Sequence, residues 1–208
     1  MGEKEVKASI LIVEDDLDTA ELLSLQLESI DIEIDVARNG QEAILITGEQ
    51  PPDLVIMDVM MPRLNGFETT RFFKAKFRDA YVPVLILSAK DAPEDIANGA
   101  RYGCDGYMTK PYKRHEIKSA VEDMLRIGKL ENETLDLRGA TSTDPQVMKE
   151  IAQRRVDTSS ALVAVRIKVA ERLISRGIGD VAKAHLTRIL EVTPGHTQAE
   201  SLLTQIGE

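Results

Sequence analysis

The sequence predicts an α/β protein with a doubly wound, five-stranded parallel sheet, followed by a small all-α helical region. Short apolar runs alternate with amphipathic helical patterns over the first 127 residues, and no strand pattern appears after residue 143. The runs are apolar throughout rather than alternating, which is typical of strands covered by helices on both faces. Parallel strands joined by crossover helices account for both features.

The five expected strands are short, apolar and rich in β-branched residues, and they cover residues 10–13, 32–37, 54–57, 84–87 and 107–109. Helices are expected between and after them, at about 17–30, 40–48, 67–77, 91–103 and 113–127. We expect Asp91 to cap the fourth of these helices, with Pro93 in its first turn and Gly103 at its end.

Composition changes along the chain indicate four regions: a tail at 1–7, a first domain at 8–127, a polar linker at 128–143 and a helical region at 144–208. The helical region begins with an N-cap and first-turn proline at Asp144 and Pro145. Its four expected helices cover about 145–156, 160–176, 180–192 and 197–206.

Composition excludes several classes of protein. Hydrophobic residues make up 43% of the chain, enough for a globular core and too many for a disordered chain. No apolar run approaches the ~20 residues of a membrane span. The start of the sequence, MGEKEVK, is charged where a secretory signal is apolar, and the one cysteine suits a reducing compartment. We therefore expect a cytoplasmic protein without a membrane partner.

Charge is distributed unevenly. Residues 1–127 contain 15 Lys and Arg against 24 Asp and Glu, a net charge of −9, whereas residues 128–208 contain 11 of each. The acidic first part argues against nucleic-acid or phosphate binding through its surface, and it is compatible with a cation site.

Polar side chains follow four of the expected strands, and parallel strands end at one edge of the sheet, where ligands bind. Clustered carboxylates repel each other unless a cation or proton lies among them, and hard oxygen ligands favour Mg²⁺. With a lysine and a hydroxyl beside them, they suit a phosphoryl group on a carboxylate. These residues are Glu14, Asp15 and Asp16 after the first strand, Asp58 after the third, Ser88 after the fourth and Lys110 after the fifth.

Residues 8–127 resemble the receiver domain of two-component response regulators. The resemblance is carried by the motifs ILIVEDD, LVIMDVMMPRLNG, ILSA and YMTKP, which occur in the family's order and spacing. It covers 120 of the 208 residues. A single motif is weak, but four in register on a βα repeat are specific. The resemblance implies a flavodoxin-like fold with strand order 2-1-3-4-5.

The resemblance also implies a Mg²⁺-dependent phosphoacceptor site. Asp58 resembles the aspartate that accepts the phosphoryl group. Asp15 resembles a direct Mg²⁺ ligand, and Glu14 resembles the acidic residue that acts through water. Met60 resembles the position whose backbone carbonyl reaches the metal. A nearby acid, Asp16, is interpreted as the N-cap of the first helix rather than as a ligand.

The remaining residues that the resemblance identifies are those that respond to the phosphoryl group. Lys110 resembles the lysine that pairs with the phosphate, and we expect a cis bond between it and Pro111. Ser88 resembles the hydroxyl residue that bonds the phosphoryl oxygen, and Tyr107 resembles the aromatic residue that swings inward on activation. This movement would remodel the face formed by the fourth helix, fifth strand and fifth helix.

The implied chemistry is transfer of a phosphoryl group from a sensor histidine kinase or phosphotransfer protein to Asp58, with Mg²⁺ and Lys110 neutralising charge. The protein is then a phosphorylated switch rather than a dedicated enzyme. The family tunes hydrolysis of the acyl phosphate at two positions, here Met60 and Lys90. Both side chains are long, so we expect slow autodephosphorylation.

The stretch from Arg166 to Pro194 partly matches the tetratricopeptide pattern. Small residues, Ala170 and Ala182, would let two antiparallel helices approach closely, but Arg166 stands where a tryptophan is expected. We interpret the region as a protein-interaction output with a downstream protein partner. A plain helical hairpin bundle and a homodimerisation unit are the alternatives.

A DNA-binding output is the rival interpretation, and it would make the protein a transcriptional response regulator. Residues 145–188 contain nine basic against four acidic side chains. These charges have the helical spacing of a solvated face, and neither a helix-turn-helix signature nor wing strands are apparent. The sequence therefore argues against nucleic acid as the partner.

Two other classes of protein share some of these residues or this fold. A haloacid-dehalogenase-type phosphohydrolase needs a second aspartate two residues after its nucleophile, where this chain has Met60. A flavodoxin-like cofactor domain needs a phosphate-binding loop after the first strand, where the acids would repel the phosphate. His115, His185 and His196 lack metal-ligand spacing, and we assign them no catalytic role.

Overall fold

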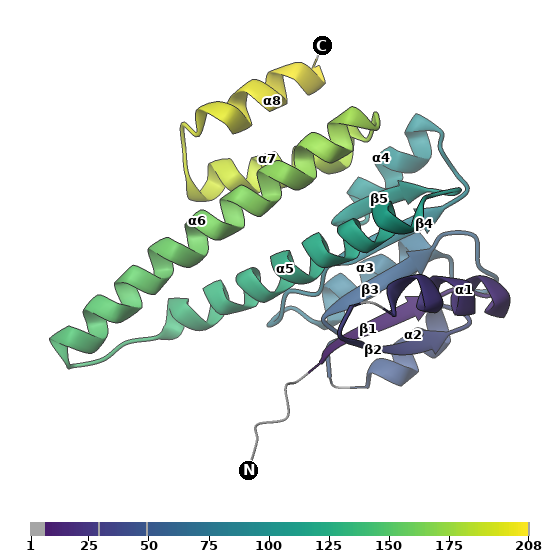
Figure 1. Cartoon of the computed structure of the whole chain (residues 1–208), viewed down its shortest axis with the longest axis horizontal. Coiled ribbons are helices and arrows are strands. Elements are labelled where there is room, and N and C mark those ends of the chain that lie inside the picture. The colour runs from purple at the N-terminus through teal and green to yellow at the C-terminus, as the bar shows by residue number, and fades with distance from the viewer. Residues whose placement is uncertain (1–6, 29, 49, 208) are drawn as a thin grey trace.

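The computed structural model describes residues 7–28, 30–48 and 50–207 and contains an α/β part followed by a helical region (Figure 1). The predicted parallel sheet is confirmed, with strand order β2-β1-β3-β4-β5. The resemblance had implied this order. The strands are β1 (Ala8–Val13), β2 (Ile32–Ala37), β3 (Leu54–Asp58), β4 (Val84–Ser88) and β5 (Gly106–Thr109).

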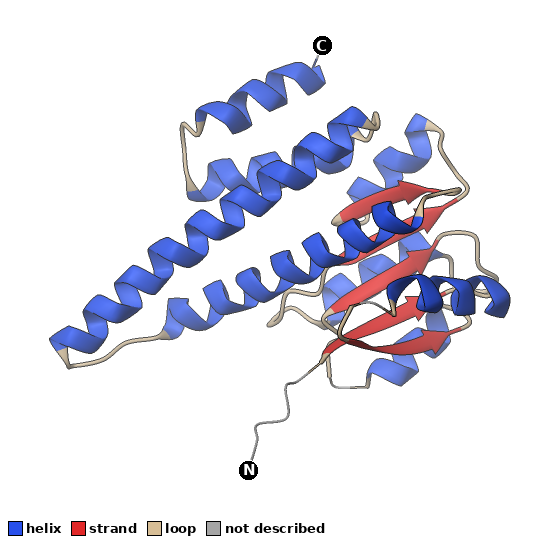
Figure 2. Ribbon diagram, in the orientation of Figure 1, coloured by secondary structure: helices blue, strands red, loops and turns tan. Residues whose placement is uncertain are grey.

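Helices cover both faces of the sheet, as Figure 2 shows. α1 and α5 pack together on one face, and α2 and α3 pack together on the other. This arrangement buries every residue of β3 and β4. The helices of the α/β part are α1 (Leu17–Leu27), α2 (Gly40–Thr47), α3 (Gly66–Lys76), α4 (Pro93–Arg101) and α5 (Arg114–Gly139).

Strand β2 departs from the expectation of strands that are apolar throughout. Its side chains alternate in exposure, and Glu33 and Asp35 face solvent. Because β2 is an edge strand, its face is only partly covered by helices, so successive side chains alternate between core and water.

Helix α4 begins one residue later than expected from an Asp91 cap. Its N-cap is Ala92, whose methyl side chain cannot accept a capping hydrogen bond, and Pro93 occupies the first helical position. The helix ends at Arg101, and Gly103 follows with a φ of 87°, a conformation that favours glycine.

The largest difference from the sequence prediction concerns the linker at 128–143. Residues 128–139 continue α5, and only five residues, 140–144, then connect it to the next helix. Gly128 and Leu137 are buried there, so packing stabilises helix in a stretch whose polar composition resembles a linker.

The helical region contains α6 (Pro145–Ser175), α7 (Gly179–Val192) and α8 (Thr197–Gly207). The expected break near residues 157–159 is wrong, because α6 passes through it unbroken and buries Thr158. This stretch has no glycine or proline to end a helix. Ala170 and Ala182 are fully buried in the two helices that pack together, as their size predicted.

The helical region packs on the α/β part. α6 runs beside α5, α7 contacts α4, and α8 packs on the other two C-terminal helices (Figure 1). One apolar cluster extends from the sheet into α6 and α7. Among the residues that the structure describes, no helix is long and apolar enough to cross a membrane.

Candidate functional site

Three carboxylates meet at the carboxyl ends of β1 and β3. Asp58 ends β3 and is 6% exposed, Glu14 follows β1 and is 7% exposed, and Asp15 faces solvent. One carboxylate oxygen of each lies within 4.8 Å of the others. The structure therefore brings together the acidic residues that the sequence selected for a cation site.

Lys110 joins the two buried acids. Its Nζ lies 2.8 Å from Asp58 Oδ1 and 2.7 Å from Glu14 Oε2. Burial lowers the pKa of Lys110, but its bonds to Asp58 and Glu14 outweigh burial and raise that pKa overall. Burial and the neighbouring Asp58 raise the pKa of Glu14, and Lys110 only partly offsets them. One ammonium group thus leaves excess negative charge, which suits a divalent cation.

The backbone around Asp58 is tightly packed. The N–H of Met60 donates to Asp58 Oδ2, which orients the carboxylate. A Cβ on Gly66 would lie 2.1 Å from the Asp58 carbonyl oxygen, so only glycine fits there. In the sequence, Gly66 is only the last residue of the motif LVIMDVMMPRLNG, which gives no sign of this close approach to Asp58.

Ser88 and Tyr107 both contact the backbone of Lys90. Ser88 ends β4, is fully buried and accepts a 3.1 Å hydrogen bond from the Lys90 N–H. Tyr107 is 2% exposed, and its hydroxyl donates to the Lys90 carbonyl oxygen at 2.9 Å. The Tyr107 side chain is therefore already buried in this structure, whereas the resemblance implied that it swings inward on activation.

Of the two residues expected to affect hydrolysis of the acyl phosphate, only Met60 has its side chain at the site. The Met60 side chain is 60% exposed at the rim of the site. Lys90 Nζ instead pairs with Asp95 of α4 at 2.9 Å.

Two local expectations are confirmed. Asp16 is the N-cap of α1, and its side chain accepts a 2.7 Å hydrogen bond from the Thr19 N–H. The bond between Lys110 and Pro111 is cis.

A second polar cluster, which sequence reasoning missed, begins at Asp105 just before β5. Asp105 accepts hydrogen bonds from the Lys74 ammonium at 2.5 Å, from the Val84 N–H at 2.9 Å and from the Tyr81 hydroxyl. Burial raises the pKa of Asp105, but Lys74 and these bonds lower it to about 2. Asp105 is thus a buried anion within the receiver part.

The helical region completes this cluster with Arg166 and His185. Arg166 is 2% exposed and donates to Glu131 and, at 3.3 Å, to the Tyr81 hydroxyl. His185 Nδ1 lies 2.9 Å from Arg166 Nη1, and its Nε2 lies 2.6 Å from the Asp105 carbonyl oxygen. Because arginine can only donate and a carbonyl can only accept, His185 is neutral with its proton on Nε2.

Further ion pairs join α6 to α5. Lys168 and Arg172 pair with Asp123 at 2.9 and 2.7 Å. Arg176 pairs with Glu116 at 2.6 Å. Basic side chains that the sequence suggested as a solvated face therefore meet acids of α5.

The helical region also approaches Tyr107, the aromatic residue that the resemblance places in the switch. A small cavity of about 20 Å³ between β5, α5 and α6 is lined by Tyr107 and by Val169 and Leu173 of α6. The face expected to be remodelled on activation is thus covered by α6 and α7.

Comparison with known proteins identifies the family. Residues 10–122, more than half of the chain, match the response regulator receiver domain. The chain resembles the receiver domain of the Francisella response regulator 1452, with a TM-score of 0.53 and 29% identity over 58% of this chain and 98% of that one. The fold and the match thus define a receiver domain, and the chain belongs to the response regulator family rather than to a class of dedicated enzymes.

Among curated proteins, the chain is similar to Response regulator MprA of Mycobacterium tuberculosis, with 32% identity covering 80% of this chain and 75% of that protein. It is 28% identical to Probable transcriptional regulator ycf27 of Cyanophora paradoxa, covering 96% and 83%. It is 35% identical to DNA-binding response regulator MtrA of Mycobacterium leprae, covering 58% and 52%. The tetratricopeptide resemblance has no support from these relatives.

Proposed function

We propose that Asp58 accepts a phosphoryl group from a sensor histidine kinase or phosphotransfer protein, and that this modification controls the docked helical region. The observation that supports this most directly is the buried Asp58 carboxylate bonded to Lys110 beside two further acids. Taking a carboxylate out of water is costly, and Asp58 lies at the edge of the sheet where ligands bind, which favours a chemical role for it over a purely structural one.

The carboxylate set fits Mg²⁺, because three acids share one lysine. Glu14, Asp15 and Asp58 would hold the ion, with the Met60 carbonyl as the further ligand that the family resemblance implies. The ion would neutralise charge on the transferred phosphoryl oxygens. An Asp58 oxygen attacks phosphorus, the bond from phosphorus to the donor nitrogen breaks, and Lys110 pairs with a phosphoryl oxygen.

Coupling to the helical region would run through Lys90. When the Ser88 hydroxyl turns to bond the phosphoryl group, it changes the contact that Ser88 makes with the Lys90 N–H. The Lys90 carbonyl also holds the Tyr107 hydroxyl, and Tyr107 borders α6 beside Leu173. Phosphorylation would therefore loosen α6 from this face.

This coupling can be tested by hydrogen exchange of α6 and α7 with and without acetyl phosphate and Mg²⁺. We expect faster exchange in these helices for the wild type and no change for Asp58→Asn. Ser88→Ala should still gain the phosphoryl mass but lose the change in exchange. Unchanged exchange in a fully phosphorylated wild type would refute the coupling.

For the output, the names of two relatives favour DNA binding over a partner protein, and the alignment with the ycf27 protein extends over the helical region. The structure also suggests how phosphorylation could permit DNA binding. Arg166, Lys168, Arg172 and Arg176 pair with acids of α5, and release would free them for phosphates. On this proposal the acids of α5 mask a basic surface in the docked protein.

A protein-interaction output remains the second candidate, because release would also expose apolar side chains of α6 such as Val169 and Leu173. Fluorescence anisotropy with duplex DNA, before and after phosphorylation, separates the two. DNA output requires phosphorylation-dependent binding that weakens steeply with salt. If no such binding is found, a protein partner is favoured. That partner could be a second copy of the chain, and light scattering would detect the dimer.

A further inference from the structure

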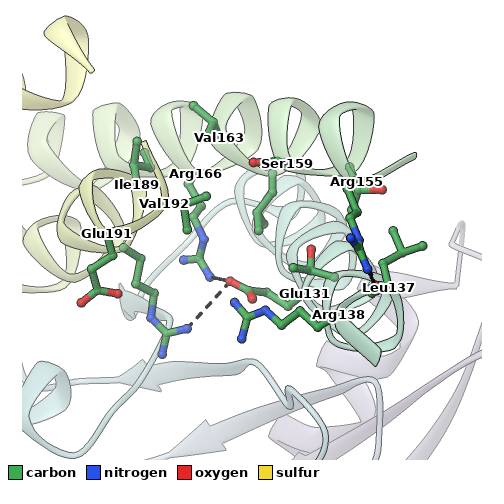
Figure 3. Close-up of a pocket in the computed structure, with 14 residues that line it drawn as sticks. Glu131, Leu137, Arg138, Arg155, Ser159, Val163, Arg166, Ile189, Glu191 and Val192 are labelled. Atoms are coloured by element: carbon green, nitrogen blue, oxygen red, sulfur yellow. Dashed lines mark hydrogen bonds and ion pairs between the residues drawn. The ribbon is translucent and has the colours of Figure 1, made fainter. Parts of the chain in front are cut away.

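A pocket of about 320 Å³ lies between α5, α6 and α7 (Figure 3). This volume is at the lower end of the range of small-molecule sites, about 300–1,000 Å³. No step of the proposed phosphoryl transfer uses it. Its walls come from the long α5 and from two helices beyond the receiver match.

The inner wall of the pocket is apolar. Leu137, Leu162 and Ile189 are buried side chains from three different helices, and Val163 and Val192 extend the same surface toward the mouth. Such a surface favours a hydrocarbon group over water.

The pocket is also positively charged. Four arginines and two glutamates line it, which leaves a formal net charge of +2. Arg155 is fixed by hydrogen bonds to the carbonyl oxygens of Leu137 and Ala140, at 2.7–3.0 Å. Arg138 and Arg188 have exposed side chains, and Figure 3 shows Arg138 extending from α5 into the space between the helices. Arg188 Nη1 also lies 3.8 Å from Glu131 Oε1, which leaves its other N–H groups unused by that pair. The mouth thus presents guanidinium groups that can bind an anion.

Arg166 also lines the pocket, and it is 2% exposed. Its guanidinium already donates to Glu131 and to the Tyr81 hydroxyl, so the arginines open to a ligand are those at the mouth.

We propose that this pocket binds a medium-chain organic carboxylate. The hydrocarbon chain lies against Leu137, Leu162 and Ile189, and the carboxylate pairs with Arg138 and Arg188 at the mouth. Because the site joins α5 to the helical region, an occupied pocket stabilises the docked arrangement.

Isothermal titration of the full-length chain with octanoate tests this, with octylammonium as a ligand of equal chain length and opposite charge. We expect one octanoate per chain with a Kd of about 1 mM or tighter, and octylammonium at least about tenfold weaker. Arg138→Gln should weaken octanoate about tenfold. Arg126→Gln, on an exposed arginine of the same helix outside the pocket, should leave it unchanged.

A second pair of variants tests the location of the site. Val163→Phe fills the pocket and should abolish octanoate binding, whereas Val156→Phe, on the exposed face of α6, should not. Circular dichroism checks that both variants are folded. Absence of saturable octanoate binding by the wild type, equal affinity for the two ligands, or binding insensitive to Val163→Phe would each overturn the proposal.

Discussion

The residues around Asp58 differ in how readily they could be predicted from the sequence. Glu14, Asp15 and Lys110 could be predicted because each follows a strand in a recognisable motif, and parallel strands end at the same edge. The close packing of Gly66 against Asp58 could not, because a turn glycine has the same appearance in a sequence whether or not a carbonyl lies behind it.

Gly66→Ala should destabilise the protein by about 3 kcal/mol, because its Cβ would overlap the Asp58 carbonyl oxygen. Gly139→Ala is the matched control, since its Cβ meets nothing within 4 Å at the end of α5. That control should change stability by about 1 kcal/mol or less. Urea unfolding followed by circular dichroism measures both, and equal stabilities would contradict the packing described for Gly66.

At the level of elements, the sequence placed the strands well and the α5–α6 connection poorly. The strands have short apolar runs that local pattern identifies. The end of α5 is polar, and its helix is stabilised by contacts with α6, which lies far along the chain. Arg166 was missed for the same reason, because its partners on α5 and α7 appear only when the helices pack together.

Arg166→Met should destabilise the docked helices by about 3 kcal/mol, because Glu131 loses its close partner in a buried site. Lys168→Met on the same helix should cost about 1 kcal/mol or less. The Lys168 side chain is 58% exposed, and Arg172 still pairs with Asp123 in that variant. Urea midpoints give both values, and a larger loss for Lys168→Met would contradict the importance of the buried cluster.

The contact that His185 of α7 makes with Arg166 and Asp105 should become less stable in mild acid. Burial and then Arg166 lower the pKa of His185 to about 4, from 6.5. Arg188 lowers that pKa further, and Asp105 raises it. As the pH falls below 6.5, His185 becomes protonated in the unfolded chain but stays neutral in the folded chain. The folded state therefore loses stability until the pH reaches about 4.

The expected loss at about pH 5, relative to about pH 7.5, is about 2 kcal/mol from His185 alone. The His185→Gln variant cannot titrate at this position, so its stability should fall less over the same interval. Urea unfolding of both proteins at the two pH values isolates the contribution. Parallel losses in the two proteins would show that His185 is not responsible.

For the whole molecule, the receiver part could be predicted because its motifs and strand pattern agree with one fold. The position of the helical region could not be predicted, since charges at helical spacing look alike whether they face water or a neighbouring helix. In the structure, basic side chains of α6 meet acids of α5, and the helical region covers the face beside Tyr107. On the proposed function, the docked arrangement places the helical region where phosphorylation of Asp58 would act on it.

The most direct test of this account is the intact mass of the purified protein after incubation with acetyl phosphate and Mg²⁺, beside Asp58→Ala treated in the same way. The account predicts one added phosphoryl group on the wild type, none on Asp58→Ala, and none on the wild type when Mg²⁺ is removed by a chelator. A wild type that takes up no phosphoryl group from several donors, or an Asp58→Ala protein that takes up one, would contradict it.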